Sequence, residues 1–135
     1  MRPLIVTLAL LAALVPARAD PPGADSLYHY RAVITEVYDG DTVTIDVDLG
    51  FSVWVRGERL RLARIDAPEV RGADREAGLA AREFLRSLVL DKPIIVQTIR
   101  DRKGKFGRYI AELWLDGENV NDRLVAEGHA VFREY

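Results

Sequence analysis

Three short clusters of charged residues supply the side chains with which this sequence could do chemistry. The first is the run Asp39-Gly40-Asp41, which lies between two segments that alternate like β-strands. An Asp-Gly pair in that place is typical of a tight hairpin turn, because both residues tolerate positive φ angles. The turn does not require Asp41, whose carboxylate could serve a divalent cation. The cluster is therefore either a plain turn or one part of a metal site.

The second cluster combines Arg61, Asp66 and Glu69 around the end of a predicted strand, where Pro68 forces the chain to leave it. A solvated salt bridge is the simpler interpretation of this trio. If the fold brings the strand ends of Asp41 and Asp66 together, a second interpretation becomes available, namely a site for a divalent cation. Two carboxylates, a backbone carbonyl and water are sufficient ligands for Ca²⁺.

The third cluster is the run from Lys103 to Arg108, with the sequence KGKFGR. A solvated, charged hairpin is the simpler interpretation. The functional interpretation is a phosphate clamp, because glycines allow a close approach of the backbone. Arg108 offers a planar fork of donors that a phosphate accepts at two oxygens.

These clusters lie at the ends of predicted elements. Alternation and helical periodicity predict strands at residues 31–37, 42–49, 53–65, 94–99 and 108–115, and helices at 74–89 and 120–127. Gly57 interrupts the third strand, and Arg64 breaks its alternation, which predicts a bulge or a side chain lying along the rim. This order is typical of an α+β fold: a five-stranded OB-type barrel with two or three packed helices. We expect this domain at residues 28–135.

The first nineteen residues have the pattern of a signal peptide. Arg2 precedes an apolar run at residues 4–15, and the small-residue motif at 17–19 predicts cleavage after Ala19. The run of about twelve residues is too short to span a bilayer, and a buried N-terminal helix would be the alternative. We therefore expect a periplasmic or secreted protein without membrane association after cleavage. Residues 20–27, rich in proline and glycine, are expected to form a flexible leader.

The composition and the net charge exclude several classes of functional site. The 135 residues allow one domain, and 49% hydrophobic with 30% charged residues is ordinary for a globular protein. The absence of cysteine excludes disulfides, thiolate zinc sites and a cysteine nucleophile. The net charge is −2, and loss of residues 1–19 removes two arginines and no acid, which leaves −4. Nucleic-acid chemistry would therefore need a local cluster of Arg and Lys.

Taken together and in this order, the clusters resemble the staphylococcal (micrococcal) nuclease family, the thermonucleases. The resemblance is carried by YDGDT at 38–42, RL at 61–62, IDAPE at 65–69 and FGRY at 106–109. It continues into the pairs at 116–117, 120–121 and 124–125, and spans residues 30–132. The family's fold is a five-stranded barrel with helices, as the pattern also predicts.

The resemblance implies calcium-dependent hydrolysis of phosphodiester bonds in DNA and RNA, in endo or exo mode, leaving 3′-phosphate ends. Single-stranded substrate and a monomeric enzyme are expected. The family pattern makes Asp41 and Asp66 the calcium carboxylates, and places a carbonyl ligand at Ala67. It assigns catalysis and substrate contact to five further residues: Arg61, Glu69 and Arg108 for catalysis, and Lys105 and Phe106 for substrate contact. Glu69 would deprotonate the attacking water, and the two arginines would stabilise the phosphoryl charge.

An alternative is a catalytically inactive OB-fold module that binds single-stranded nucleic acid or a protein partner. Phe51 and Trp54 would be the anchors for a protein, although Trp54 is also expected in the barrel core or at a hairpin crossing. The complete set of acids argues against an inactive module. Two departures from the family bear on substrate preference: the segment at 49–58 is longer, and Phe106 replaces a tyrosine.

Overall fold

The computed structural model describes residues 28–103 and 105–134. The predicted signal peptide and leader lie outside the described residues. Within them, none of the helices is both long and apolar enough to span a membrane.

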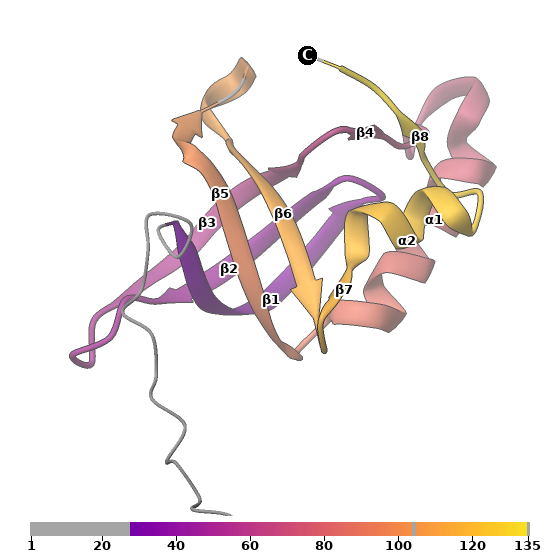
Figure 1. Cartoon of the computed structure of the whole chain (residues 1–135). Coiled ribbons are helices and arrows are strands. Elements are labelled where there is room, and N and C mark those ends of the chain that lie inside the picture. The colour runs from indigo at the N-terminus through magenta and orange to yellow at the C-terminus, as the bar shows by residue number, and fades with distance from the viewer. Residues whose placement is uncertain (1–27, 104, 135) are drawn as a thin grey trace, which may run out of the picture.

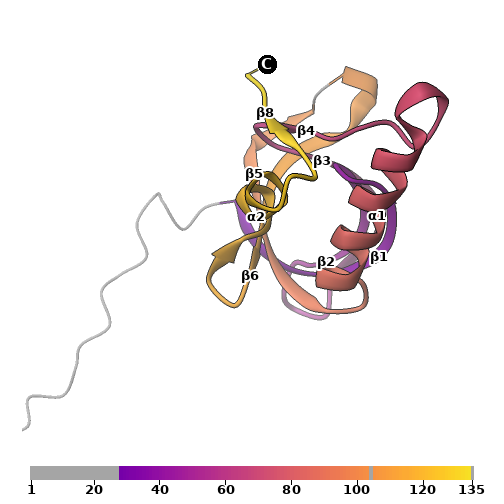
Figure 2. The same ribbon diagram turned by 90° about the vertical axis from the view of Figure 1, so that its right-hand side faces the viewer.

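Five strands close into a barrel (Figures 1 and 2). They are β1 (His29–Asp39), β2 (Thr42–Asp48), β3 (Trp54–Leu62), β5 (Pro93–Lys103) and β6 (Tyr109–Leu115), hydrogen-bonded in the order β3-β2-β1-β5-β6. Consecutive strands of this order are antiparallel. The ring closes through a parallel pairing of β3 with β6, from Leu60 opposite Tyr109 to Leu62 opposite Ala111. The predicted OB-type α+β barrel is confirmed.

Two helices and several short elements complete the fold. The helices are α1 (Arg75–Val89) and α2 (Val120–Ala126), and both lie at the end of the barrel opposite the β2–β3 hairpin (Figure 1). Two-residue strands β4 (Ile65–Asp66) and β8 (Val131–Phe132) pair with each other, and β7 (Glu118–Asn119) pairs antiparallel with the end of β6. The 3-10 turns are η2 (Gly72–Asp74) and η3 (Lys105–Gly107).

The core follows the predicted periodicities. Val43 and Ile45 alternate along β2, as Leu60 and Leu62 do at the end of β3, and all four point into the barrel and are almost completely buried. The apolar stripe of α1 buries Ala81, Leu85 and Val89 against it. Burial of large side chains such as Leu85 is worth about 1.5–3 kcal/mol each, so this stripe fixes α1 against the barrel.

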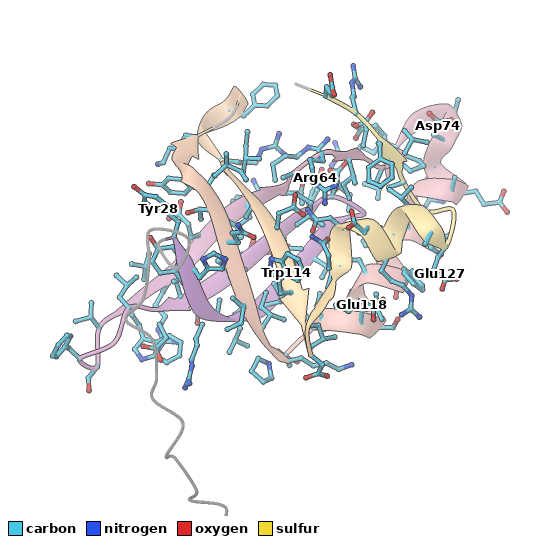
Figure 3. The ribbon with its side chains drawn as sticks, in the orientation of Figure 1. Tyr28, Arg64, Asp74, Trp114, Glu118 and Glu127 are labelled. Carbon is cyan, nitrogen blue, oxygen red and sulfur yellow. The ribbon has the colours of Figure 1, made fainter. Side chains whose placement is uncertain are left out.

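The predicted strand at 53–65 is wrong in one respect, because it does not run through Arg64. β3 ends at Leu62, and Arg64 adopts a left-handed conformation with φ 63° before β4 begins. Arg64 is labelled in Figure 3, and its guanidinium forms ion pairs with Glu112 on β6 and Asp122 on α2. The predicted interruption at Gly57 is present, with φ 70° and a shift in the register between β2 and β3.

Of the two positions expected for Trp54, the barrel core and a hairpin crossing, the structure has the second. Trp54 pairs opposite Asp48 in the β2–β3 hairpin, and it is 40% exposed, while Phe51 at the tip is fully exposed. The hairpin extends beyond the barrel (Figure 1), and the guanidinium carbon of Arg56 lies 4.8 Å from the centre of the Trp54 ring. Trp54 therefore marks a hairpin crossing.

Candidate active site

The charged residues of the first two clusters meet because of how three strands pair. Thr42 at the start of β2 lies opposite Arg61 on β3, and the amide of Leu62 donates a hydrogen bond of 2.8 Å to the carbonyl of Asp41. The turn at Gly40 also packs closely against the chain beyond β4, since a Cβ there would lie 2.6 Å from that of Ala67. The turn, the end of β3 and β4 thus form one surface.

Arg61 links the two carboxylates that the sequence singled out. Its Nη2 lies 3.2 Å from Asp41 Oδ2 and 3.1 Å from Asp66 Oδ1. Its Nη1 donates to the carbonyls of Leu62 and Ile65, at 3.0 and 2.9 Å. With 14% of its side chain exposed, Arg61 is fixed at the centre of the cluster. The structure therefore brings Asp41, Asp66 and Arg61 together.

The protein partners of Asp41 do not fully stabilise the ionised form of its carboxyl group. The residue is 6% exposed, and burial is the largest influence on its pKa, followed by the charge of Asp39. The amide of Ala67, which donates at 2.7 Å, and Arg61 both act in the opposite direction. The net result raises the pKa of Asp41 to about 7. A bound cation would stabilise the ionised form.

Arg108 approaches the same surface from the third cluster. Its Nη1 donates to Thr42 Oγ1 at 3.1 Å, and the ring of Phe106 lies 5.5 Å from the guanidinium carbon. The Nε atom is buried and has no hydrogen-bond partner in the described part of the chain. A buried donor without a partner is costly, so this nitrogen is suited to an anionic ligand.

Glu69 is exposed and lies in the loop that follows β4. Among residues 28–103 and 105–134 it makes no hydrogen bond or ion pair, so it does not join the cluster around Arg61. Phe106 is 80% exposed, and the side chain of Lys105 lies outside the described residues. Glu69 and Phe106 are thus accessible to a ligand.

Helix α1 supports the backbone of Glu69 through a glycine. A Cβ at Gly78 would lie 2.1 Å from the Glu69 carbonyl oxygen and 2.8 Å from the Val70 amide nitrogen. Both atoms belong to the backbone, so a side chain cannot swing aside to relieve the contact. The position of the Glu69 loop therefore depends on the absence of a side chain at Gly78.

We expect Gly78→Ala to destabilise the protein by about 1–3 kcal/mol, because the added methyl overpacks this contact. Helix propensity alone predicts the opposite sign, since alanine favours a helix over glycine by about 1 kcal/mol. Thermal unfolding would show a fall in Tm of roughly 5–15 °C. An unchanged or higher Tm would contradict the close approach. Exposed Ala80→Gly, on the same helix, is the control for propensity.

Sequence reasoning missed four residues that shape the site. Asp39 is buried and accepts the amide of Asp41 at 3.0 Å, and Thr42 accepts from Arg108. Arg133, beside β8, lies 2.8 Å from Asp66 Oδ2. The fully buried Asn121 donates to the carbonyls of Ala63 and Ala111, which fastens α2 to the end of β3. Asp39 and Thr42 had local signals, because Asp39 belongs to the predicted Asp-Gly turn and Thr42 lies on the polar face of an alternating strand.

The donors at this site suit a hard cation. Within the described residues, no three His, Cys, Asp or Glu side chains are grouped so that they could hold a metal ion by themselves. Asp41 and Asp66 nevertheless converge on one nitrogen of Arg61, and the Ala67 amide lies against Asp41. Two carboxylates with backbone and water oxygens form a set that fits Ca²⁺ and not a soft metal.

Comparison with known proteins gives consistent matches. A family model described as Staphylococcal nuclease homologue matches residues 59–135. A thermonuclease of Staphylococcus intermedius is 32% identical over 106 residues, which cover 76% of this chain and 60% of that protein. A thermonuclease of Staphylococcus hyicus is 27% identical, covering 76% and 59%. An uncharacterized endonuclease of Haemophilus influenzae is 30% identical, covering 76% and 52%. The matched region thus spans between about half and three fifths of each of these relatives.

Proposed function

The chain belongs to the staphylococcal nuclease family, and on that premise we propose that it is a calcium-dependent nuclease that hydrolyses phosphodiester bonds of DNA and RNA. One observation carries the proposal. The carboxylates of Asp41 and Asp66 converge on Nη2 of the Arg61 guanidinium. Thr42, which lies opposite Arg61 in the strand pairing, accepts a hydrogen bond from Arg108. Cations beside a carboxylate pair are the components that phosphoryl transfer requires.

The two arginines would act on the phosphate. Charge on the phosphoryl oxygens increases in the transition state, and fixed guanidinium groups in a partly buried site stabilise it without reorganising. Arg108 has a buried Nε without a partner among the described residues, and Arg61 is held by two backbone carbonyls. Arg108 would therefore bind the phosphate directly. Arg61, which contacts the two carboxylates, would stabilise the phosphoryl charge through its own positive charge.

Glu69 would act as the general base. Its carboxylate is exposed and has no described partner, so it is available to accept a proton from the attacking water. Attack of this water at phosphorus, in line with the leaving 5′ oxygen, would break the bond to that oxygen and leave a 3′-phosphate end and a 5′-hydroxyl end. An arginine is effectively never neutral, so neither Arg61 nor Arg108 serves as the proton donor to the leaving oxygen.

Asp41 and Asp66 would hold the calcium ion, with the backbone carbonyl of Ala67 as a third ligand. Bound Ca²⁺ would neutralise phosphate charge and favour a nucleophilic water. The raised pKa of Asp41 supports this role, because a cation compensates the charge that burial and Asp39 disfavour. We also propose export, with cleavage after Ala19, a periplasmic or secreted location, and a monomeric enzyme that prefers single strands.

Release of acid-soluble nucleotides tests the proposal. We expect the mature protein, beginning after Ala19, to degrade single-stranded DNA and RNA in millimolar calcium, and a chelator to abolish the release because the site then lacks its cation. The 3′ ends of the products should accept a polymerase only after phosphatase treatment. Calcium should also raise the Tm, and Asp41→Asn should remove that increase.

The absence of release from folded protein in calcium would overturn the nuclease assignment. The matched reaction with the chelator shows whether any degradation depends on the metal. Binding of a labelled single strand by an inactive protein would instead support the OB-fold binding module.

A further inference from the structure

A groove of about 660 Å³ lies between α1 and the second half of β1, outside the cluster around Arg61. It exists because β1 pairs with β5 only from His29 to Val33. Beyond the contact of Ile34 with Leu90, the edge of β1 at residues 35–38 has no strand partner on this side in the described structure. Figure 2 shows α1 running beside β1 along this edge.

Four arginines line this groove: Arg71, Arg75, Arg82 and Arg86. The last three lie on one face of α1, at spacings of seven and four residues, with Leu79 between them. In the described residues, the side chains of Arg71, Arg75 and Arg86 make no hydrogen bond or ion pair, and that of Arg82 has only a contact of 3.4 Å with Glu83. Like charges at this spacing repel one another, so the stripe is suited to an anion.

The charge of the groove differs from that of the chain. Its lining contains four arginines against two acids, Glu36 and Asp91, although the protein as a whole carries −2. An acidic protein that acts on a polyanion needs such a local concentration of positive charge, because phosphate neutralisation provides most non-specific affinity. The arginines of α1 provide it on a rigid element.

The groove leads to the proposed active site. Its lining includes Tyr38 and Val70, the immediate chain neighbours of Asp39 and Glu69. From Arg75 to Arg86, α1 extends about 16 Å, a length over which its arginines can contact several phosphates of one strand. Tyr38 is exposed, with Arg59 5.5 Å from its ring centre, and offers a face on which an unpaired base can stack.

We propose that this groove binds the sugar-phosphate backbone of a single nucleic-acid strand, adjacent to the phosphodiester that is cleaved. The proposal rests on the nuclease function proposed above and extends it with a second binding site. Arg75, Arg82 and Arg86 contact phosphates along the strand, and Tyr38 stacks on a base at the end near the active site. The groove favours long, unpaired substrates over dinucleotides.

Comparison of Arg75→Gln/Arg86→Gln with Arg31→Gln/Arg123→Gln tests the groove, because both variants lose two charges and the second loses them elsewhere. We expect the groove variant to raise the KM for a strand of about 12 nucleotides by about tenfold and to leave kcat on a dinucleotide unchanged. The slope of log KM against log salt should fall by about 1.4, or about 0.7 for each lost phosphate contact. The control variant should match the wild type, and Tm values confirm that both fold.

Fluorescence anisotropy of the same strand in chelator provides a readout that does not depend on activity. If the wild type binds the strand tightly but cleaves nothing in calcium, the nuclease proposal fails and the groove proposal is judged on binding alone. If the groove variant binds like the wild type with an equal salt slope, the groove proposal is wrong. An equal loss in the control variant would also overturn it, since net charge would then explain the effect.

Discussion

Glu69→Gln should reduce kcat on single-stranded DNA by about 10² or more, while KM and Tm stay close to the wild-type values. General base catalysis typically contributes 10²–10⁴, and a neutral amide cannot accept the proton of the attacking water. The side chain is exposed and has no described partner, so its replacement removes no interaction of the folded state. Initial rates at saturating substrate and calcium, with a thermal melt, check both parts.

Glu76→Gln is the matched control, because it removes one exposed carboxylate from the first turn of α1. It should retain wild-type activity. If Glu69→Gln kept more than about a third of wild-type kcat, Glu69 would not be the base, since even modest base catalysis exceeds that difference.

Arg108→Lys should lower kcat by about 10²–10³ with little change in stability, although the positive charge is kept. Removal of one oriented donor from a transition-state site costs about that factor. Lysine is a point charge without the planar fork, so it cannot at once contact Thr42 and present a second nitrogen where Arg108 Nε is buried. Single-turnover rates would separate this loss from slow product release.

The corresponding change at Arg61 is a poorer test of chemistry. Arg61 contacts two carboxylates and two backbone carbonyls, so its replacement leaves buried groups without partners and alters folding as well.

Full activity of Arg108→Lys would show that charge alone suffices at that position. A large fall in its Tm would show that Arg108 stabilises the fold and would leave no separate catalytic assignment.

Much of the barrel could be predicted because its signals are local. Val43 and Ile45 alternate with polar residues, and the stripe of Ala81, Leu85 and Val89 has helical spacing. Each pattern depends on residues that lie within about two turns of one helix or within a few positions of one strand. The strand positions, both helices and the Asp-Gly turn follow from them.

Other features required contacts that no local pattern contains. Trp54 has a strong strand preference, which is satisfied equally well in the core or in a hairpin that extends beyond it. Arg64 leaves the strand with a positive φ and pairs with residues 48 and 58 positions away. The groove beside α1 is open because β5 stops pairing with β1 after Val33.

By itself, the sequence determined which chemical groups are available: the carboxylates of Asp41, Asp66 and Glu69, and the guanidinium groups of Arg61 and Arg108. The tertiary structure alone decided that Asp41 and Asp66 meet at one nitrogen of Arg61, that Arg133 reaches Asp66, and that burial raises the pKa of Asp41. The physical reason is barrel closure. Alternation and propensity act over a few residues, whereas convergence and burial depend on pairings such as that of β3 with β6, between segments distant in the chain.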